Sequence, residues 1–181
     1  MVDIYLVRHG EAAASWGEDP DPGLSHLGRQ QARQVRDELE RYENLHIVSS
    51  PMLRAKETAQ PLATALRKEV HIEEAFREIP SPVGIENRQA WLSGFMRQDW
   101  QEQGPEVLEW RERAWDTLFE MERHTAIFTH FMIINAICSR LMEAPETVCC
   151  VPDNGSVTRL KLAKKTLELV EVGRQQQTHV S

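Results

Sequence analysis

Asp3-Ile4-Tyr5-Leu6-Val7-Arg8-His9-Gly10-Glu11 is an apolar run that ends abruptly in a cation, an imidazole and a glycine. Its near-continuous apolar part, Ile4 to Val7, is typical of a strand buried on both faces in the middle of a parallel sheet. Such a strand places Arg8 and His9 at the sheet edge where ligands bind in open α/β folds. Gly10 allows a sharp turn there. The stretch predicts an α/β fold with a candidate site at the end of the first strand.

At 181 residues the chain suits a single domain over residues 1–181. We expect a helical insertion in this domain at about 80–122. The chain has 21 basic and 28 acidic residues, which gives a net charge of −7, and it has no lysine or arginine block. This balance disfavours nucleic acid and anionic membranes as partners. There is no cationic leader before an apolar core, and no apolar run approaches the ~20 residues of a membrane helix. We therefore expect a cytoplasmic protein.

The rest of the chain alternates strands and helices. Ser25 is a typical N-cap of a helix that reaches about Tyr42. Pro51 suits the first turn of the next helix, which Pro61 is expected to kink or split. We expect the Gln-rich end from Arg174 to be frayed. The other expected elements are strands at Leu45–Val48, Val70–Glu73 and Thr125–Thr129, a helix at Phe131–Leu141, and a C-terminal hairpin through Lys164-Lys165.

The pattern of residues 89–122 predicts two helices with a break at Gly104-Pro105. Helix packing is the simpler interpretation of the tryptophans in this segment, and a substrate-contacting aromatic lid is the alternative. The oligomeric state stays open, because the segment could cover a pocket or form the interface of a homodimer. The tryptophans concerned are Trp91, Trp100, Trp110 and Trp115.

The cysteines give no sign of a disulfide scaffold or a zinc site. Cys138, Cys149 and Cys150 are odd in number and lack CxxC spacing, so we expect reduced, partly buried thiols. His9 and His130 have no carboxylate or thiol at ligand spacing, so no metal is expected between them.

Cationic side chains follow three predicted strands. Arg8 and His9 end the first, Arg54 lies just after the second, and His130 follows Thr125–Thr129. Parallel strands bring such ends to one sheet edge, where guanidinium forks can bind phosphate and a histidine can donate hydrogen bonds or attack phosphorus. A small phosphate monoester is therefore the expected partner.

Four motifs in order extend this interpretation. They are Leu6-Val7-Arg8-His9-Gly10-Glu11, then Leu24-Ser25 with Gly28, Gln31 and Ala32, then Ser49-Ser50-Pro51-Met52-Leu53-Arg54-Ala55 with Glu57-Thr58-Ala59, and finally Thr129-His130. In these motifs the sequence resembles the histidine phosphatase superfamily, also called phosphoglycerate mutase-like, including its small bacterial phosphatases. The resemblance implies a three-layer α/β/α sandwich with a mostly parallel central sheet, an antiparallel C-terminal strand and a helical insertion.

The resemblance also implies phosphomonoester hydrolysis through a phosphohistidine, without metal or cofactor. His9 would attack phosphorus while Arg8, Arg54 and His130 hold the equatorial oxygens. The arginines should favour the neutral imidazole of His9 by like-charge repulsion. Glu78 occupies the position of the family's proton donor, and its apolar neighbours should raise its pKa. Glu86 is the alternative donor.

Three positions depart from the usual pattern of the family. Ala12 stands where many members have Thr or Ser, and Ser15 where many have a phosphate-contacting Asn. Ser15 and backbone N–H groups such as that of Gly10 could substitute in substrate binding. Phe131 follows His130 where Gly is usual, so its ring could close the pocket over an apolar substrate or simply pack. Asn154 is expected to approach the site from its turn.

Three rival functions stay open. The same site would serve a phosphoglycerate-type mutase, although the short chain favours hydrolysis. A phosphohistidine protein phosphatase would need less acid help from Glu78, because its leaving group is a phosphoramidate nitrogen. The altered positions Ala12, Ser15 and Phe131 also fit a non-catalytic module that only binds a phosphorylated ligand.

Overall fold

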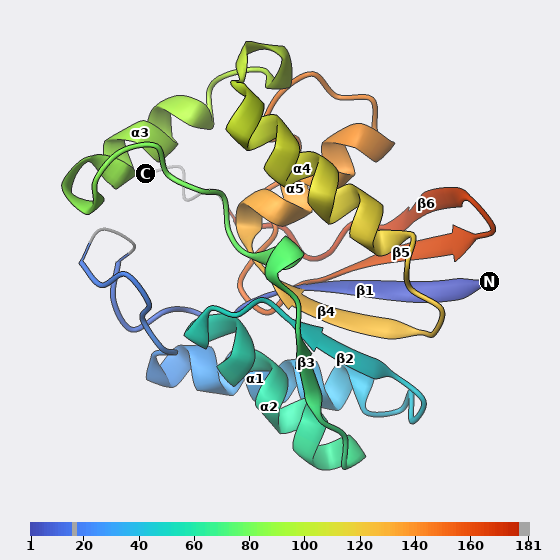
Figure 1. The fold of residues 1–181 in the computed structure, drawn as a ribbon. Coiled ribbons are helices and arrows are strands. Elements are labelled where there is room, and N and C mark those ends of the chain that lie inside the picture. The colour runs from blue at the N-terminus through green and yellow to red at the C-terminus, as the bar shows by residue number, and fades with distance from the viewer. Residues whose placement is uncertain (16–17, 178–181) are drawn as a thin grey trace.

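A computed structural model describes residues 1–15 and 18–177, and within them one sheet lies between two layers of helices (Figure 1). The strand order in the sheet is β3-β2-β4-β1-β5-β6. The strands are β1 (Val2–Arg8), β2 (His46–Ser49), β3 (Val70–Ile72), β4 (Thr125–Thr129), β5 (Val157–Ala163) and β6 (Thr166–Glu171). The α-helices are α1 (His26–Leu39), α2 (Leu53–Leu66), α3 (Arg88–Phe95), α4 (Pro105–Leu118) and α5 (Phe131–Leu141).

The sheet is parallel from β3 to β1 and antiparallel beyond it. β1 pairs in parallel with β4, β4 with β2, and β2 with β3, whereas β5 is antiparallel to both β1 and β6. The predicted α/β/α sandwich with a mostly parallel sheet is confirmed, and both strands of the C-terminal hairpin join it in antiparallel fashion. The parallel arrangement puts the carboxyl ends of β1, β2 and β4 at one edge.

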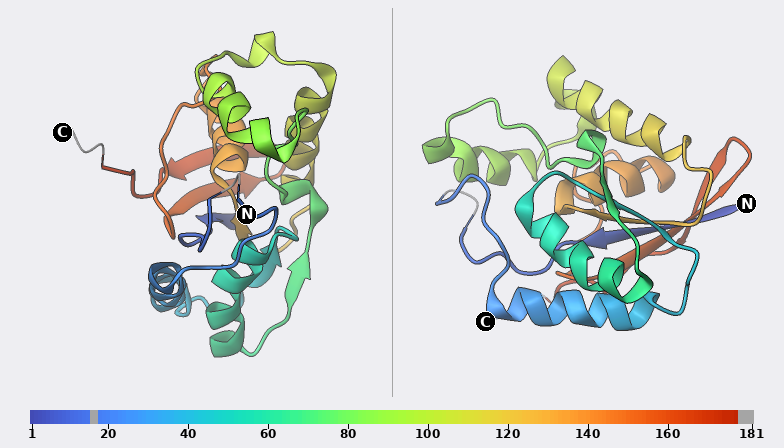
Figure 2. Two further views of the ribbon diagram at one scale, coloured as in Figure 1. Left: turned by 90° about the vertical axis from the view of Figure 1, so that its left-hand side faces the viewer. Right: turned by 60° about the horizontal axis from the view of Figure 1, so that its bottom comes forward.

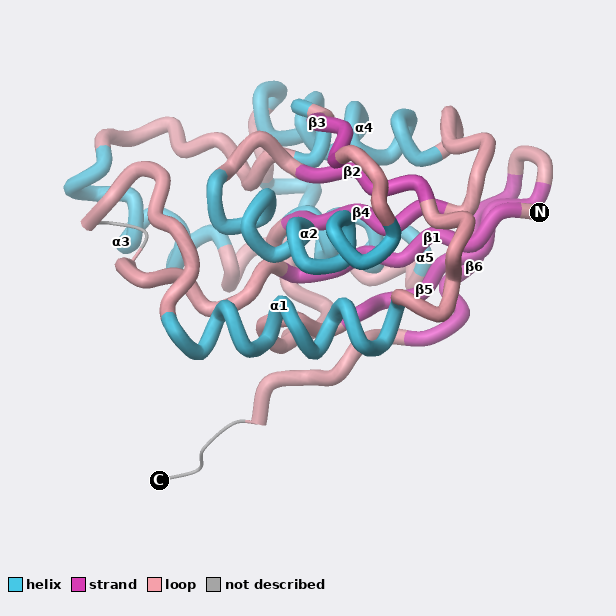
Figure 3. The backbone as a smooth tube through the Cα atoms, turned by 90° about the horizontal axis from the view of Figure 1, so that it is seen from below, coloured by secondary structure: helices cyan, strands magenta, loops and turns pink. Residues whose placement is uncertain are grey.

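The continuous apolar run of β1 reflects burial on both faces of the sheet. Tyr5 and Val7 belong to the core under α1 and α2, whereas Ile4 and Leu6 belong to the core under α4 and α5. Figure 3 looks onto the α1 and α2 side. Successive side chains of a strand alternate between faces, so a central strand needs apolar residues at every position.

The start of α1 matches the prediction, whereas the start and the course of α2 differ from it. Ser25 caps α1 as predicted, because its Oγ accepts a hydrogen bond from the Gly28 N–H at 3.0 Å. The N-cap of α2 is Met52, so Pro51 precedes this helix instead of entering its first turn. Of the two effects expected of Pro61, a kink or a split, the split is wrong, since α2 runs on to Leu66. Buried residues on both sides of Pro61 pack against the sheet, and this packing outweighs the lost backbone hydrogen bond.

Gly10 and Gly28 allow the loop after β1 to cross the start of α1. A Cβ on Gly28 would overlap the Glu11 carbonyl oxygen, which is backbone and cannot swing away. We expect Gly28→Ala to lower the free energy of unfolding by about 1–3 kcal/mol, as overpacking does. Urea denaturation would measure it. Gly94→Ala in α3 is the matched control, because nothing lies within 4 Å of its added Cβ and alanine favours helix. Equal effects of the two changes would contradict this account.

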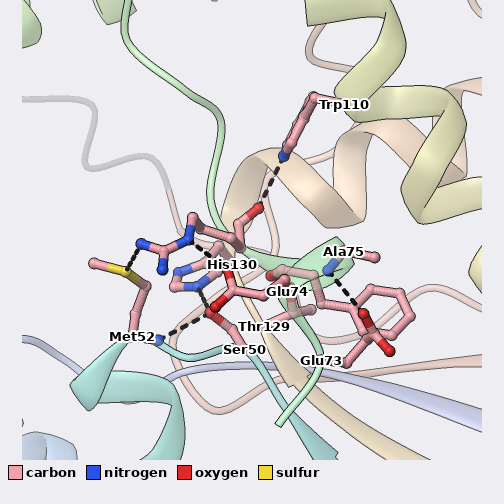
Figure 4. Close-up of polar contacts among 10 residues, drawn as sticks. Ser50, Met52, Glu73, Glu74, Ala75, Trp110, Thr129 and His130 are labelled. Atoms are coloured by element: carbon pink, nitrogen blue, oxygen red, sulfur yellow. Dashed lines mark hydrogen bonds and ion pairs between the residues drawn. The ribbon is translucent and has the colours of Figure 1, made fainter.

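The insertion consists of α3 and α4 with a short 3-10 helix, Trp100–Glu102, between them. Its tryptophans support the packing interpretation: Trp100 is buried edge-on against Phe95, and Trp91 stacks on the same ring. The Trp110 indole N–H donates to the Arg77 carbonyl at 2.9 Å (Figure 4). None of these described tryptophans lines the cavity at the sheet edge. Figures 1 and 2 place α3 beyond that edge, at the same end of the molecule as the loop after β1.

The segment after β6 is held in place, so the prediction of fraying is wrong for Arg174 to Gln176. The Gln176 N–H donates to the Val151 carbonyl at 2.7 Å, and the Val151 N–H donates to Gln175 Oε1 at 2.6 Å. Arg174 Nε pairs with Asp153 Oδ2 at 3.2 Å. These long-range bonds have no local sequence signal. Residues 178–181 lie outside the described part of the chain.

Candidate active site

A cavity of about 310 Å³ lies at the carboxyl end of β1. Four of the predicted site residues line it, and they come from separate parts of the fold: Arg8 ends β1, His9 follows it, Arg54 lies in the first turn of α2, and Glu78 lies in the chain before the insertion. The other described lining residues are Ala12, Ala14, Pro22, Leu92, Met96, Phe131, Met132, Val151 and Gln176. Of these, Phe131 was expected at the pocket from the sequence, whereas Leu92, Met96 and Val151 gave no signal for this role.

The ring of His9 is held in one orientation by both of its nitrogens. Nδ1 lies 2.7 Å from the Gly10 carbonyl oxygen, which can only accept a hydrogen bond. Nε2 accepts a hydrogen bond from Arg54 Nε at 3.2 Å. Both contacts are satisfied together by the neutral tautomer with its proton on Nδ1. The lone pair of Nε2 then faces the guanidinium of Arg54.

The two arginines are buried or half-buried and keep unused donors. Arg8 Nη1 donates to the Pro152 carbonyl at 2.8 Å, and its guanidinium carbon lies 5.2 Å from the ring centre of Phe131. Arg8 Nε and Arg54 Nη1 have no hydrogen-bond partner among the described residues. Buried donors of this kind normally have partners, and an anion beside His9 would supply acceptors.

His130 completes the cluster from the start of α5. Its ring centre lies 5.3 Å from that of His9, and its Nε2 lies 2.7 Å from Ser50 Oγ (Figure 4). Ser50 Oγ also accepts from the Met52 N–H at 3.2 Å. Within the described chain Nδ1 of His130 has no partner. His130 is fully buried, lies next to His9 and is not among the described lining residues of the cavity.

Glu78 faces the cavity with a carboxyl group held by two backbone N–H groups. Oε1 accepts from Ile79 at 3.0 Å, and Oε2 accepts from Met132 at 3.4 Å. Burial raises its pKa, although these hydrogen bonds and the charges of Arg54 and Arg8 act in the opposite direction. The alternative donor, Glu86, is exposed and is not among the described lining residues.

The electrostatics of the cluster favour neutral histidines. Burial lowers the pKa of His9 well below its usual value, and the charges of Arg54 and Arg8 lower it further. Burial likewise lowers the pKa of His130, with Arg54 and His9 as the next causes. The sequence indicated the arginine effect on His9, but burial is the larger cause. A neutral imidazole is the nucleophilic form.

These lowered pKa values make stability depend on pH. The unfolded chain binds protons on both histidines below about pH 6.5, whereas the folded chain does not. The free energy of unfolding is therefore highest above that pH. It decreases as the pH falls, by at most about 1.4 kcal/mol per pH unit for each histidine. We expect a double variant, His9→Gln with His130→Gln, to lose less stability than the wild type between pH 7.5 and 5.0 in urea denaturation. Parallel pH profiles of the two proteins would contradict this expectation.

The remaining residues that the sequence predicted at the site are Gly10, Ser15 and Asn154. The Gly10 N–H donates to Thr58 Oγ1 at 2.9 Å, so this glycine supports the turn. Ser15 is exposed and is not among the described lining residues, whereas Ala12 is. Asn154 approaches the site as expected, because its Nδ2 donates to the His9 carbonyl at 3.1 Å.

The cysteines are free, with Cys138 and Cys150 buried and Cys149 half-buried. A hydrogen bond with Cys138 raises the pKa of Cys150 to about 12, whereas a reactive cysteine has a lowered pKa.

Among residues 1–15 and 18–177, no group of three or more His, Cys, Asp or Glu side chains is placed to hold a metal ion. In the same part of the chain, every helix is too short or too polar to cross a membrane.

Residues 4–175 match the histidine phosphatase superfamily (branch 1), and the chain belongs to that superfamily. The probable phosphoglycerate mutase GpmB of Salmonella paratyphi C is 35% identical over 95 residues. That match covers 49% of this chain and 43% of the relative, so it spans less than half the length of the curated relative.

Solved structures extend the likeness over nearly the whole chain. The phosphoserine phosphatase of Entamoeba histolytica, in complex with 3-phosphoglyceric acid, is 25% identical with a TM-score of 0.73 and covers 97% of this chain and 98% of that one. YhfR of Bacillus stearothermophilus has a TM-score of 0.80 at 21% identity, with 94% of this chain and 96% of that chain covered. At this identity, the likeness to YhfR shows a shared fold alone.

Proposed function

We propose that the protein is a phosphomonoester hydrolase that works through a phosphohistidine on His9, without a metal ion. The observation that carries this proposal is the unprotonated Nε2 of His9, which faces Arg54 Nε at 3.2 Å inside a cavity that Arg8 also lines. The family and the phosphoserine phosphatase neighbour support the same class of reaction.

In the first step, His9 Nε2 attacks phosphorus in line with the ester oxygen. The N–P bond forms as the P–O bond to the leaving group breaks, and Glu78 gives its proton to the departing oxygen. Arg8 and Arg54 donate hydrogen bonds to equatorial oxygens, where charge is redistributed in the transition state. His130 is the third donor in this proposal, because its Nδ1 has no partner among the described residues and its ring centre lies 5.3 Å from that of His9. The raised pKa of Glu78 keeps the required proton on this residue at a higher pH than usual.

In the second step, the ionised Glu78 takes a proton from water as the water oxygen attacks phosphorus. The N–P bond breaks, orthophosphate leaves, and His9 returns to its neutral form. No other acid or base is needed, because the proton lost by Glu78 in the first step is restored in the second.

The test is to trap the intermediate. The wild-type protein is incubated with phenyl phosphate, quenched at alkaline pH, where phosphohistidine survives, and digested for mass spectrometry. We expect a phosphate adduct on the peptide that contains His9, together with release of phenol and orthophosphate. Tight vanadate binding without an adduct or turnover would replace this proposal with a module that only binds phosphorylated ligands.

A mutase is the second candidate, because the Salmonella relative is named a probable phosphoglycerate mutase. Incubation with 3-phosphoglycerate distinguishes the two reactions. A hydrolase releases orthophosphate in proportion to the substrate lost, whereas a mutase gives the isomeric monoester with little free phosphate.

A further inference from the structure

We propose that the leaving-group end of the cavity selects phosphate monoesters of apolar, uncharged alcohols or phenols over esters that carry a carboxylate. This inference rests on the proposed hydrolase function and names its substrate class. It concerns the part of the cavity away from His9, which the chemical steps above leave unassigned.

The wall of this part is apolar and is assembled from distant segments. Leu92 and Met96 come from the end of α3, Phe131 begins α5, and Val151 lies on the loop that precedes β5. Leu92, Met96 and Phe131 are half-buried and Val151 is 37% exposed, so these side chains are open to a ligand. Large apolar side chains that converge on a concave site are typical of a pocket for an apolar ligand.

The charged groups of the cavity lie together near His9. The described lining residues that can carry charge are Arg8, His9, Arg54 and Glu78. Arg54 contacts His9, and the charges of Arg54 and Arg8 act on both His9 and Glu78. Arg77 and Arg88 act electrostatically on this cluster but are not among the described lining residues. Gln176 is the neutral polar side chain of the described wall.

Among the described lining residues, a second anionic group on the substrate would therefore meet no cation other than Arg8 and Arg54, which the phosphate occupies. A buried carboxylate without a partner is strongly disfavoured, and the ionised form of Glu78 would repel it. Phe131 marks the boundary between the two ends, because its ring faces the guanidinium of Arg8. The cavity volume of about 310 Å³ suits one aryl ring or a short alkyl chain.

The first test compares matched substrates on the full-length protein. We expect kcat/KM for phenyl phosphate to exceed that for 3-carboxyphenyl phosphate at least about tenfold. From ethyl to butyl to hexyl phosphate, kcat/KM should rise by up to about fourfold per methylene, the factor that corresponds to ~0.8 kcal/mol. An equal or higher kcat/KM for the carboxylated ester, or no rise with chain length, would overturn the inference.

The second test moves a cation into the apolar wall. Leu92→Lys should raise the kcat/KM ratio of 3-carboxyphenyl to phenyl phosphate by about tenfold or more, because the ammonium would pair with the carboxylate. Leu108→Lys adds the same charge at a residue of α4 that is 39% exposed and is not among the described lining residues, so it should leave the ratio unchanged. The same ratio in Leu92→Lys and Leu108→Lys would contradict a leaving-group pocket at Leu92.

Binding measurements separate the inference from the reaction. Calorimetry with hexylphosphonate and 5-carboxypentylphosphonate, which cannot be hydrolysed, reports the preference whether or not the protein turns over esters. Tighter binding of hexylphosphonate in a protein without turnover would reject the hydrolase proposal and support the apolar pocket. Tighter binding of the carboxylated phosphonate would reject the pocket and leave hydrolysis intact.

Discussion

The His9→Gln variant is expected to lose about 10⁴-fold or more of its kcat with phenyl phosphate and to take up no phosphate on the peptide that contains residue 9. The glutamine amide is close in size to the imidazole but has no nucleophilic lone pair on nitrogen. Arg8 and Arg54 remain in the variant, so phosphate binding should be largely kept. The loss should therefore appear in kcat.

His26→Gln is the matched control, because it removes an exposed histidine of α1 that is not among the described lining residues of the cavity. Its kcat should equal that of the wild type. Thermal unfolding of both variants shows whether the fold is kept. A His9→Gln protein that is folded and still turns over within about tenfold of the wild type would reject His9 as the nucleophile.

The Glu78→Gln variant is expected to lose activity according to the leaving group. With hexyl or phenyl phosphate, whose leaving oxygen needs a proton, kcat/KM should fall by about 10²–10⁴-fold. With 2,4-dinitrophenyl phosphate, whose leaving group departs as a stable anion, the fall should be less than about tenfold when phosphorylation of His9 limits the rate. Pre-steady-state release of phenol or 2,4-dinitrophenol measures this step.

The pH profile tests the same role. Burial raises the pKa of Glu78, so the proton-donating form persists above the usual carboxyl range and is lost as the pH rises through that raised pKa. The corresponding fall in kcat/KM on the alkaline side should be present in the wild type and absent from Glu78→Gln.

Glu86→Gln is the control for Glu78, since Glu86 is exposed and was the alternative donor in the sequence. It should behave like the wild type with every substrate. A large loss in Glu86→Gln with none in Glu78→Gln would transfer the acid role. If Glu78→Gln retains full activity on hexyl phosphate, Glu78 is not the acid. If the wild-type protein acts only on phosphohistidine, the rival function of a phosphohistidine protein phosphatase is favoured.

Local signals in the sequence were sufficient for the elements that form the sheet edge. The apolar run Ile4–Val7 identified the central strand because both of its faces are buried, and Ser25 identified the start of α1 through its cap. The helix split expected at Pro61 is wrong, because packing on the sheet carries α2 past this residue. The prediction of a frayed tail from Arg174 is also wrong, because the partners that hold this tail, Val151 and Asp153, are distant in the sequence.

The sequence by itself determined the α/β fold and brought Arg8, His9 and Arg54 to one cavity, since parallel strands must end at the same edge. Only the tertiary structure decided the tautomer of His9, the direction of the pKa shift of His130 and the apolar wall around Leu92 and Val151. These features depend on burial and on contacts between segments distant in the chain. Periodicity and motif spacing report neighbours along the chain, so they carry no signal for such contacts.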